Sequence, residues 1–333
     1  MRRDDSDNTE AAVSVIIPTR NRRVMLLTAL QSLIEQNYPR QRYEVIVVDN
    51  DSTDGTEEMV QEITNRSNGL VRYFRQDNLG PALARNRGIK ESSGEIIAFT
   101  DSDCIAHPDW LSAGVQAMQQ DQQLGLVVGR VLPPPDRTVT FLSRFGRREQ
   151  EDFIYGTANM FYRRAALEQV DGFSPFFKRF KHYKDYVVGG EDTEVAWRVK
   201  RAGWKSTYVH EALIYHEVER ITPLEKLLFE PGRSQILPYL IREIPELRAY
   251  MFRRYFLTFE TALFDLFLLG LLSGAVVHPA LLALAIPFSY RLGRIAIAHR
   301  ENKMAKFVFF YLYFASQFLF LSYGSIRYRR LLL

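Results

Sequence analysis

Two aspartates that could share a metal ion stand two positions apart, at Asp101 and Asp103. They follow the apolar run 96–99 (Ile-Ile-Ala-Phe), which is typical of a buried strand. Carboxylate oxygens are ligands that Mg²⁺ and Mn²⁺ prefer, and Mg²⁺ keeps open positions for substrate phosphates. The same spacing occurs in solvated turns, but its place directly after a buried strand favours a site for a cation and a diphosphate.

A second acidic loop, 49–55, follows the apolar run 44–48. Ser52 or Thr53 is the expected N-cap of the next helix, and capping accounts for much of the loop's polarity. Asp49 comes before any capping position. We therefore interpret Asp49 as a contact to a nucleotide base or ribose.

A further pair of carboxylates, Glu191 and Asp192, opens a predicted helix that ends near Gly203. Acids in a first helical turn interact favourably with the helix dipole, which by itself explains Glu191. It does not explain the two preceding glycines, which indicate a close backbone approach. When a hydroxyl attacks a sugar carbon, a base must accept its proton. The pair is a candidate for that base.

Two other side chains are candidates for metal ligands. His216 follows the strand-like run 212–215, although a lone histidine is more often a hydrogen-bonded structural residue. Cys104 adjoins the aspartate pair, but we interpret it as a buried small residue rather than a thiolate ligand. As the single cysteine of the chain, it excludes an internal disulfide and fits a reducing compartment. The tryptophans are interpreted as packing residues.

The order of the apolar runs predicts an α/β fold with a mixed, mostly parallel sheet covered by helices. Ligands of such sheets bind beyond the carboxyl ends of the strands, so the loops 18–21, 49–55 and 100–103 should converge on one crevice. Residues 136–155 are basic and aromatic without a clear period, and are expected to be mobile or to face an acceptor. Strands are expected at 13–17, 44–48, 71–74, 94–99, 124–131 and 156–162. Helices are expected at 22–36, 82–92 and 163–170, with one more starting at 107–110 and another opened by 189–192 and running to about 202.

The C-terminal part of the chain is strongly apolar. Residues 266–290 carry no Asp, Glu, Lys or Arg, and 307–323 form a second uncharged run. Crossing a bilayer takes about 20 apolar residues, so both runs are candidates for spans, the alternative being buried core helices. Basic residues between and after the runs leave the number of spans open, because the positive-inside rule places both clusters on one side. A re-entrant hairpin or helices in the interface plane would satisfy that rule.

The rest of the composition limits partners and location. The net charge of +4 is small and lies largely beyond residue 290, which favours a membrane surface over nucleic acid. Residues 1–12 are polar and expected to be disordered, and they contain no signal peptide. We therefore expect a catalytic domain at 13–222 on the cytoplasmic side of the cell (inner) membrane, an amphipathic linker at 223–254 and a membrane-associated helical tail at 255–333.

In combination these residues resemble a known family. Six segments stand in the order found in family 2 glycosyltransferases, which adopt the GT-A fold and act with inversion of configuration. The resemblance covers residues 12–220. The segments are VSVIIPTRN at 13–21, VVDNDSTDG at 47–55, NLGPALARNRG at 78–88, AFTDSD at 98–103, GTANMFYR at 156–163 and GEDTEVAWRVKRAG at 190–203.

The resemblance implies roles for individual residues. Asp192 would be the catalytic base, assisted by Glu191, and Mn²⁺ or Mg²⁺ would be bound by Asp101, Asp103 and His216. His210 stands where many members have proline, and the loop at 49–51 reads Asp-Asn-Asp rather than Asp-Asp-Gly. Contacts to the nucleotide-sugar donor are implied for Pro18, Thr19, Arg20, Asp49, Asp51, Asn78, Arg85, Asp101 and Asn159.

We therefore expect an enzyme that transfers a sugar from a UDP-, GDP- or dTDP-linked donor to a hydroxyl of a glycolipid or surface glycan. Transfer to polyprenyl phosphate is an alternative, but a phosphate acceptor is already ionised and would not need the Glu191–Asp192 pair. A non-catalytic, membrane-tethered nucleotide-binding protein is a second alternative. A processive synthase is disfavoured because the tail is short and no Gln-x-x-Arg-Trp segment occurs.

Overall fold

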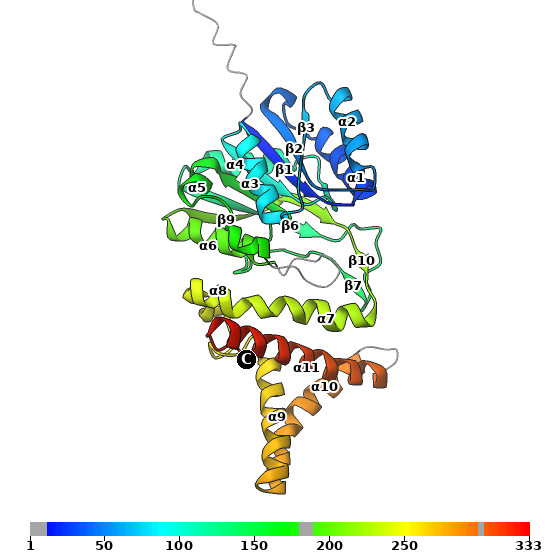
Figure 1. The fold of residues 1–333 in the computed structure, drawn as a ribbon, viewed down its shortest axis with the longest axis vertical. Helices are drawn as coiled ribbons and strands as arrows, with labels where there is room; N and C mark the ends of the chain where they lie inside the picture. The colour runs from blue at the N-terminus through cyan, green and yellow to red at the C-terminus, as the bar shows by residue number, and fades with distance from the viewer. Residues whose placement is uncertain (1–11, 180–188, 299–302) are drawn as a thin grey trace, which may run out of the picture. The chain divides into compact units, whose positions relative to one another are not determined.

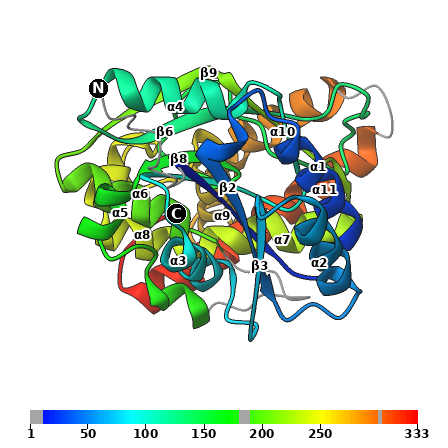
Figure 2. The same cartoon turned by 90° about the horizontal axis from the view of Figure 1, so that it is seen from above.

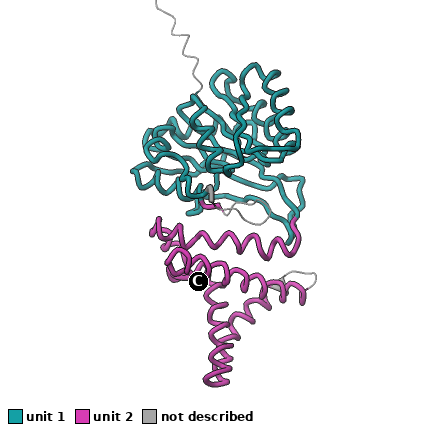
Figure 3. The backbone as a smooth tube through the Cα atoms, viewed as in Figure 1, with its two compact units in different colours: residues 1–180, 191–220 teal, residues 181–190, 221–333 magenta. Residues whose placement is uncertain are grey.

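The computed structural model describes residues 12–179, 189–298 and 303–333. The chain forms two compact units (Figure 3). Unit 1 comprises residues 1–180 and 191–220, and unit 2 comprises 181–190 and 221–333. The expected disordered N-terminus lies outside the described residues, apart from Ala12.

Eight strands among the described residues of unit 1 form one mixed sheet (Figure 1). They are β1 (Val13–Thr19), β2 (Tyr43–Asn50), β3 (Val71–Gln76), β4 (Ile96–Thr100), β5 (Cys104–Ala106), β6 (Leu124–Leu132), β8 (Asn159–Arg163) and β9 (Lys205–His216). Their order is β3-β2-β1-β4-β8-β6-β9-β5. The first four strands of this order are parallel, as are β6 and β9, whereas β8 is antiparallel to both of its neighbours. The mixed, mostly parallel sheet predicted from the sequence is confirmed.

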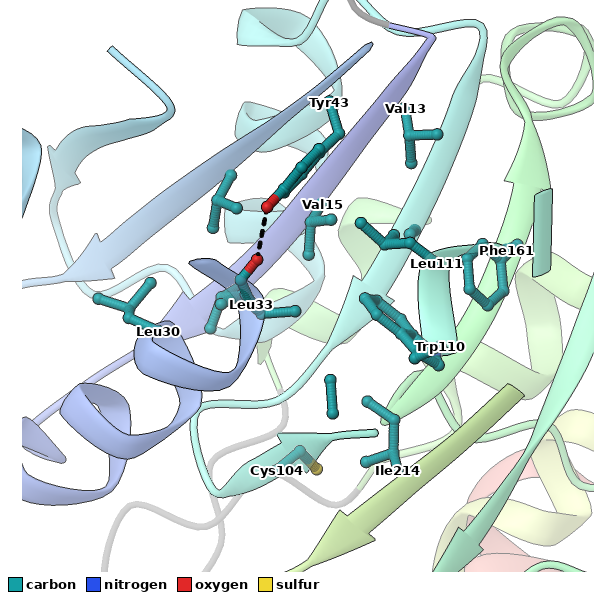
Figure 4. Close-up of a cluster of buried hydrophobic side chains, with 14 of the residues drawn as sticks. Val13, Val15, Leu30, Leu33, Tyr43, Cys104, Trp110, Leu111, Phe161 and Ile214 are labelled. Atoms are coloured by element: carbon teal, nitrogen blue, oxygen red, sulfur yellow. Dashed lines mark hydrogen bonds between the residues drawn. The ribbon is translucent and has the colours of Figure 1, made fainter. Parts of the chain in front are cut away.

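Side chains of the parallel strands alternate between two helical layers. Val13, Val15 and Ile17 of β1 face a core that includes the buried side chains of α1, α2 and α4 (Figure 4). Ile16 faces the other way, toward α3, where a Cβ on Gly88 would lie 2.4 Å from Ile16 Cγ2. Figure 2 shows α3 on one side of β2 and α1 and α2 on the other. The helices of unit 1 are α1 (Arg23–Ile34), α2 (Thr56–Arg66), α3 (Pro81–Glu91), α4 (Trp110–Gln120), α5 (Arg164–Gln169) and α6 (Glu191–Arg201).

Residues 136–155, which we expected to be mobile or acceptor-facing, belong to unit 1 and are hydrogen-bonded to the rest of it at two points. β7 (Ser143–Arg144) pairs with β10 (Glu219–Arg220). Arg148 exchanges backbone hydrogen bonds with Val131 of β6.

Unit 2 is helical. Two of its helices, α9 and α11, are long and apolar enough to cross a membrane. The predicted linker and tail both fall in this unit. Its elements are α7 (Pro223–Arg233), η4 (Ser234–Ile236), α8 (Leu237–Glu243), η5 (Pro245–Tyr250), α9 (Phe259–Val276), η6 (Pro279–Ala285), α10 (Ile286–Ala298) and α11 (Lys303–Tyr328).

Candidate active site

The loops after β1, β2 and β4 leave the sheet at one edge, which we call the carboxyl edge. Thr19 pairs with Asp49 in the parallel register of β1 and β2, and Ile16 of β1 pairs with Phe99 of β4. Asp101 follows the last residue of β4, so parallel pairing brings the acids at 49 and 101 to this edge. The predicted convergence of the three loops agrees with this register.

Asp103 and His216 are brought together by a pair of strands. β5 runs antiparallel to β9, and Cys104 pairs with His216. As a result Asp103 Oδ1 lies 3.8 Å from His216 Nε2. The ligand atoms of Asp103, Cys104 and His216 all lie within 4.8 Å of one another. Burial raises the pKa of the Cys104 thiol well above its usual value, which leaves it protonated and a poor ligand.

The donor set of this cluster suits a divalent cation. His216 Nδ1 lies 3.0 Å from the carbonyl oxygen of Glu217, which can only accept, so Nδ1 donates and Nε2 is the ring nitrogen left to face Asp103. Asp103 Oδ1 is buried and has no hydrogen-bond partner among the described residues. Asp103 Oδ1 and His216 Nε2 therefore face each other at 3.8 Å, a separation that two metal–ligand bonds of about 2.1 Å could bridge.

Arg22 supplies a positive charge at the same carboxylate. Its Nη1 lies 2.5 Å from Asp103 Oδ2, and about a third of its side chain is exposed. Burial alone would lower the pKa of Arg22, but Asp103 and Asp101 raise it overall. Arg22 thus stays charged and partly neutralises the acids at the end of β4.

Arg85 of α3 joins the acid after β4 to the acid at the start of α6. Its Nη2 lies 3.2 Å from Asp101 Oδ1, and its Nη1 lies 3.1 Å from Glu191 Oε1. The Arg85 side chain is buried, with its guanidinium over the ring of Phe173. Burial alone would lower the pKa of Arg85, but Asp101, Glu191 and Asp192 raise it overall. This one buried cation therefore holds the start of α6 at the carboxyl edge.

Asp192 faces the segment before β8. A Cβ on Gly156 would lie 3.9 Å from Asp192 Oδ2 and 2.8 Å from Arg148 Nη2, so glycine leaves room for both charged groups. Both terminal nitrogens of Arg148 donate to the Gly156 carbonyl at 3.2 Å. Burial, followed by the negative charge of Asp192, raises the pKa of the buried Tyr162 phenol. Asp192 thus lies beside a cation and a neutral hydroxyl.

Asp49 is fully buried and is held by its own loop. Its Oδ1 accepts hydrogen bonds from the Ser52 amide at 3.0 Å and the Ser52 hydroxyl at 2.6 Å, while Oδ2 accepts one from Tyr73 at 2.7 Å. The first turn of α2 is satisfied instead by Asp54, which accepts from the Thr56 amide. Asp49 therefore does not cap the helix. This agrees with the sequence, in which Asp49 comes before any capping position.

Comparison with protein families decides the family. The model described as "Glycosyl transferase family 2" matches residues 14–184, which is more than half of the chain. The chain belongs to glycosyltransferase family 2. It is 30% identical over 246 residues to Glycosyltransferase AglE of Haloferax volcanii, an alignment that covers 72% of this chain and 77% of that one.

Another relative of this family 2 glycosyltransferase matches a shorter stretch. The poly(ribitol-phosphate) beta-N-acetylglucosaminyltransferase TarS of Staphylococcus aureus is 39% identical over 90 residues, which is 27% of this chain and 16% of TarS. The two proteins therefore share only part of their lengths. Both relatives are named as glycosyltransferases, and the chain is a transferase of this kind.

Solved structures show the same fold. The mannosyltransferase PcManGT from Pyrobaculum calidifontis, in complex with GDP-Man and Mn²⁺, aligns with a TM-score of 0.55 at 18% identity, over 97% of this chain and 88% of that one. GalNAc-T7 with UDP, GalNAc and Mn²⁺ aligns with a TM-score of 0.52 at 16% identity, over 72% and 52%. The predicted GT-A fold of the family 2 glycosyltransferase is confirmed.

Several residues predicted to contact the donor lie at the carboxyl edge of this glycosyltransferase. Pro18 and Thr19 end β1, and the Thr19 hydroxyl is buried without a hydrogen-bond partner among the described residues. Arg20 follows β1, and Asn78 is half-buried in the loop before α3. Their contacts to a donor stay predictions.

Two predicted donor contacts have other tasks in the structure. Asn159 is fully buried, with its oxygen accepting from Trp110 Nε1 at 2.8 Å and its nitrogen donating to the carbonyls of Arg130 and Ala212, both at 2.7 Å. These bonds lock β8 to β6, β9 and α4, so we now assign Asn159 a structural role. Asp51 is exposed and pairs with Arg75 at 2.8 Å. A contact from either residue to a donor stays a prediction.

Two arginines near the acids, Arg22 and Arg148, are not indicated by the sequence motifs. Arg22 directly follows the first polar loop, and its place after VSVIIPTRN was the available signal. Arg148 lies in the segment 136–155, where no local pattern indicates a partner for Asp192. His210 lies 2.9 Å from Arg130 and is not part of the cluster of Asp103, Cys104 and His216.

Proposed function

We propose that this glycosyltransferase transfers a sugar from a nucleotide-diphosphate donor to a hydroxyl of a lipid-linked or surface-glycan acceptor, with inversion and with a divalent cation. The observation that carries the proposal is the Arg85 bridge between Asp101 and Glu191. It brings the predicted base pair to the same edge as Asp103, His216 and Asp49. The GDP-Man and UDP complexes of structural neighbours agree with a nucleotide-sugar donor.

In the proposed reaction the oxygen of the acceptor hydroxyl attacks the anomeric carbon. At the same time Asp192 accepts the proton of that hydroxyl. The bond from that carbon to the diphosphate oxygen breaks on the opposite face, and its electron pair leaves with the nucleoside diphosphate. Glu191 and Arg85 position Asp192, because Glu191 is buried against the guanidinium. Arg148 and Arg85 both interact with the charge of the Asp192 carboxylate.

Asp103 and His216, with Asp101 beside them, would hold Mn²⁺ or Mg²⁺. Bound there, the cation would act as a Lewis acid that stabilises the leaving diphosphate. Asp49 and Thr19 would contact the nucleotide. Two apolar helices in unit 2 support an acceptor at a membrane. We assign that membrane to the cell's inner membrane, with unit 1 on the cytoplasmic side.

Two substitutions test this assignment of roles. Asp103→Ala and Asp192→Asn should each reduce transfer at least 100-fold, whereas donor affinity in the presence of Mn²⁺ should fall only in Asp103→Ala. Asp121→Asn is the control, because Asp121 is partly exposed and pairs with Lys205 rather than with the site. The measurements are transfer rates in detergent and calorimetric binding of a panel of UDP-, GDP- and dTDP-sugars.

Equal loss of donor binding in both variants would show that the roles are wrong. Full activity of Asp192→Asn would instead favour an acceptor that is already ionised, such as polyprenyl phosphate.

A further inference from the structure

The uncharged stretch of unit 2 folds back on itself as a hairpin. α9 forms one arm, and η6 with α10 forms the other (Figure 1). A Cβ on Gly270 would lie 2.9 Å from Leu284 Cβ, and one on Gly274 would lie 2.7 Å from Leu282. These two glycines, four residues apart on α9, therefore let the second arm approach closely. We call residues 259–298 the hairpin.

The start of the first arm of the hairpin lies beside the end part of the second arm. Arg291 of α10 pairs with Glu260 in the first turn of α9 at 2.8 Å. Phe264 of α9 and Phe288 of α10 pack together, with ring centroids 5.1 Å apart. Between these closures and the turn at His278–Pro279 the hairpin carries no charge, except Asp265 next to the closed end.

The uncharged part of the hairpin exposes large apolar side chains from both arms. Surface of this size and composition is unusual on a protein that faces water alone. The exposed residues are Leu269, Leu271, Leu272, Val276, Val277, Leu282, Ile286 and Tyr290.

The second apolar helix, α11, is placed differently. One of its sides packs on the hairpin through Phe310, Phe314 and Phe318. Another side packs along α7 and η4, where a Cβ on Gly324 would lie 2.3 Å from the Gln235 carbonyl oxygen. Near the middle of α11, the Tyr313 hydroxyl lies 3.4 Å from the carboxylate of Glu230.

That contact argues against α11 as a membrane span. α7 carries four charged side chains, Glu225, Lys226, Glu230 and Arg233, of which Arg233 is exposed and the others are half-buried. If α11 crossed a bilayer, Glu230 and its helix would be carried to the bilayer centre, where a charged side chain is costly. The third side of α11 is nevertheless apolar and exposed. Its apolar residues are three, four or seven positions apart, so they lie on one face of the helix. Its residues are Met304, Val308, Leu312, Leu319, Tyr323 and Ile326.

Basic residues gather where the hairpin closes and at both ends of α11. They include Arg291, Arg294, Lys303, Lys306, Arg327, Arg329 and Arg330. Arg300, another basic residue between the two apolar runs, lies outside the described residues. Basic side chains beside an apolar surface match the chemistry of an anionic lipid headgroup layer.

We propose that unit 2 is a one-sided anchor in an anionic bilayer. The hairpin enters the bilayer and returns to the face from which it started, while α11 lies along that face with its exposed apolar side toward the acyl chains. This assigns a topology that composition alone does not, since α9 and α11 pass the same length and hydropathy test. It also places both basic clusters on one side, as the positive-inside rule requires.

Sidedness of labelling tests the topology in the full-length chain. Lys303→Cys and Arg330→Cys flank α11, and Val24→Cys marks unit 1. The variants are expressed in a bacterial inner membrane, and a membrane-impermeant maleimide is applied to spheroplasts and to inverted vesicles. The wild-type chain is the blank, because its single cysteine, Cys104, is buried.

The anchor predicts that all three cysteines react in the same preparation. Reaction of Lys303→Cys and Arg330→Cys in opposite preparations would make α11 a span and overturn the proposal.

A matched pair of charge insertions tests where the lipid lies. Val276 at the hairpin turn and Val24 on α1 are both valines, with exposed fractions of 83% and 78%. Each is replaced by Asp, the full chain is synthesised without cells in the presence of phosphatidylcholine–phosphatidylglycerol vesicles, and the bound fraction is measured by flotation. Val276→Asp should lower the ratio of bound to free protein at least tenfold, and Val24→Asp should leave it unchanged. Equal behaviour of the two variants would contradict the anchor, whether or not the chain transfers sugar.

Discussion

At the scale of single residues, four acids of the candidate site lie near arginines. Asp103 pairs with Arg22, Asp101 and Glu191 share Arg85, and Asp192 lies beside Arg148. Charges that are removed from water must be compensated in this way or they destabilise the fold. In the proposed function a donor would bring a diphosphate to the same edge, where it would compete with the acids for one of these arginines. Arg22, with 36% of its side chain exposed against 6% for Arg85, is the better placed of these two to move.

The residue scale yields a prediction about metal affinity. Replacing Arg22 by Gln removes a positive charge that repels a cation at Asp103, and after solvent screening this is worth about 1 kcal/mol. We expect the Kd for Mn²⁺ in the absence of donor to fall roughly fivefold, as measured by titration calorimetry or by electron paramagnetic resonance of free Mn²⁺.

Arg23→Gln is the matched control, because the neighbouring Arg23 reaches toward Gly55 instead. An equal change in both variants, or weaker Mn²⁺ binding by Arg22→Gln, would show that Arg22 does not compete with the cation.

At the scale of elements, Glu44 ties together the opposite edge of the sheet. Glu44 Oε1 accepts from the Ser14 hydroxyl at 2.8 Å and from the Ser93 amide at 2.7 Å, and Oε2 accepts from Arg72 at 2.6 Å. Through these partners it joins β1, β2, β3 and the turn before β4. Burial alone would raise the pKa of Glu44, but these hydrogen bonds lower it overall.

We therefore predict that Glu44→Gln destabilises unit 1 by about 2 kcal/mol near neutral pH, because Gln presents donors where acceptors are needed. This corresponds to a melting temperature lower by roughly 4–8 °C. The folded carboxyl has the lower pKa, so its stabilisation is present above the unfolded value of 4.5 and is lost as the pH falls through the folded value.

Thermal unfolding of wild type and Glu44→Gln at several pH values checks this. The gap between their melting temperatures should narrow below pH 4.5. A gap that stays constant with pH would mean that the charge of Glu44 does not contribute.

The elements also show which features a sequence can predict. The apolar runs of β1, β2 and β4 and the polar loops behind them were visible locally, which is why the carboxyl edge and its acids were found. β5 was missed, because three residues after an acidic turn carry no period. Its strand conformation depends on pairing with β9, far along the chain, and that pairing brings Asp103 to His216. In the same way, the side-chain nitrogen of Asn159 donates hydrogen bonds to carbonyls of two other strands. The local sequence around Asn159 does not indicate these partners.

At the scale of the whole molecule, the chain passes between its units directly before the predicted base. Glu191 begins α6 in unit 1, whereas Gly189 and Gly190 belong to unit 2. Both glycines have positive φ, +80° and +102°. A Cβ on Gly190 would lie 3.3 Å from Leu240 Cδ1, and one on Gly189 would lie 2.9 Å from Arg233 Nη2. The backbone in front of the base is therefore fixed by packing within unit 2, which is the close approach that the paired glycines indicated.

Because Gly190 directly precedes the predicted base pair, we predict that backbone strain introduced at Gly190 lowers the turnover rate. An alanine held at a φ of +102° costs on the order of 1–2 kcal/mol of conformational free energy. The backbone at position 190 can relieve that strain only by changing its conformation, and this shifts the adjoining Glu191 and Asp192. A displacement of about 1 Å at a catalytic group can cost 100-fold in rate. We expect Gly190→Ala to lower kcat at least tenfold, with little change in the KM for the donor.

Gly203→Ala provides the matched control at the other end of α6. Its φ of +97° imposes the same strain, but a Cβ there meets nothing within 4 Å, and it follows the helix rather than preceding the base. Both variants should lose similar thermal stability, whereas only Gly190→Ala should lose turnover. If both lose turnover equally, general destabilisation explains the effect. If neither does, the position of Asp192 does not depend on the junction between the units, and the strained glycines before α6 serve folding alone.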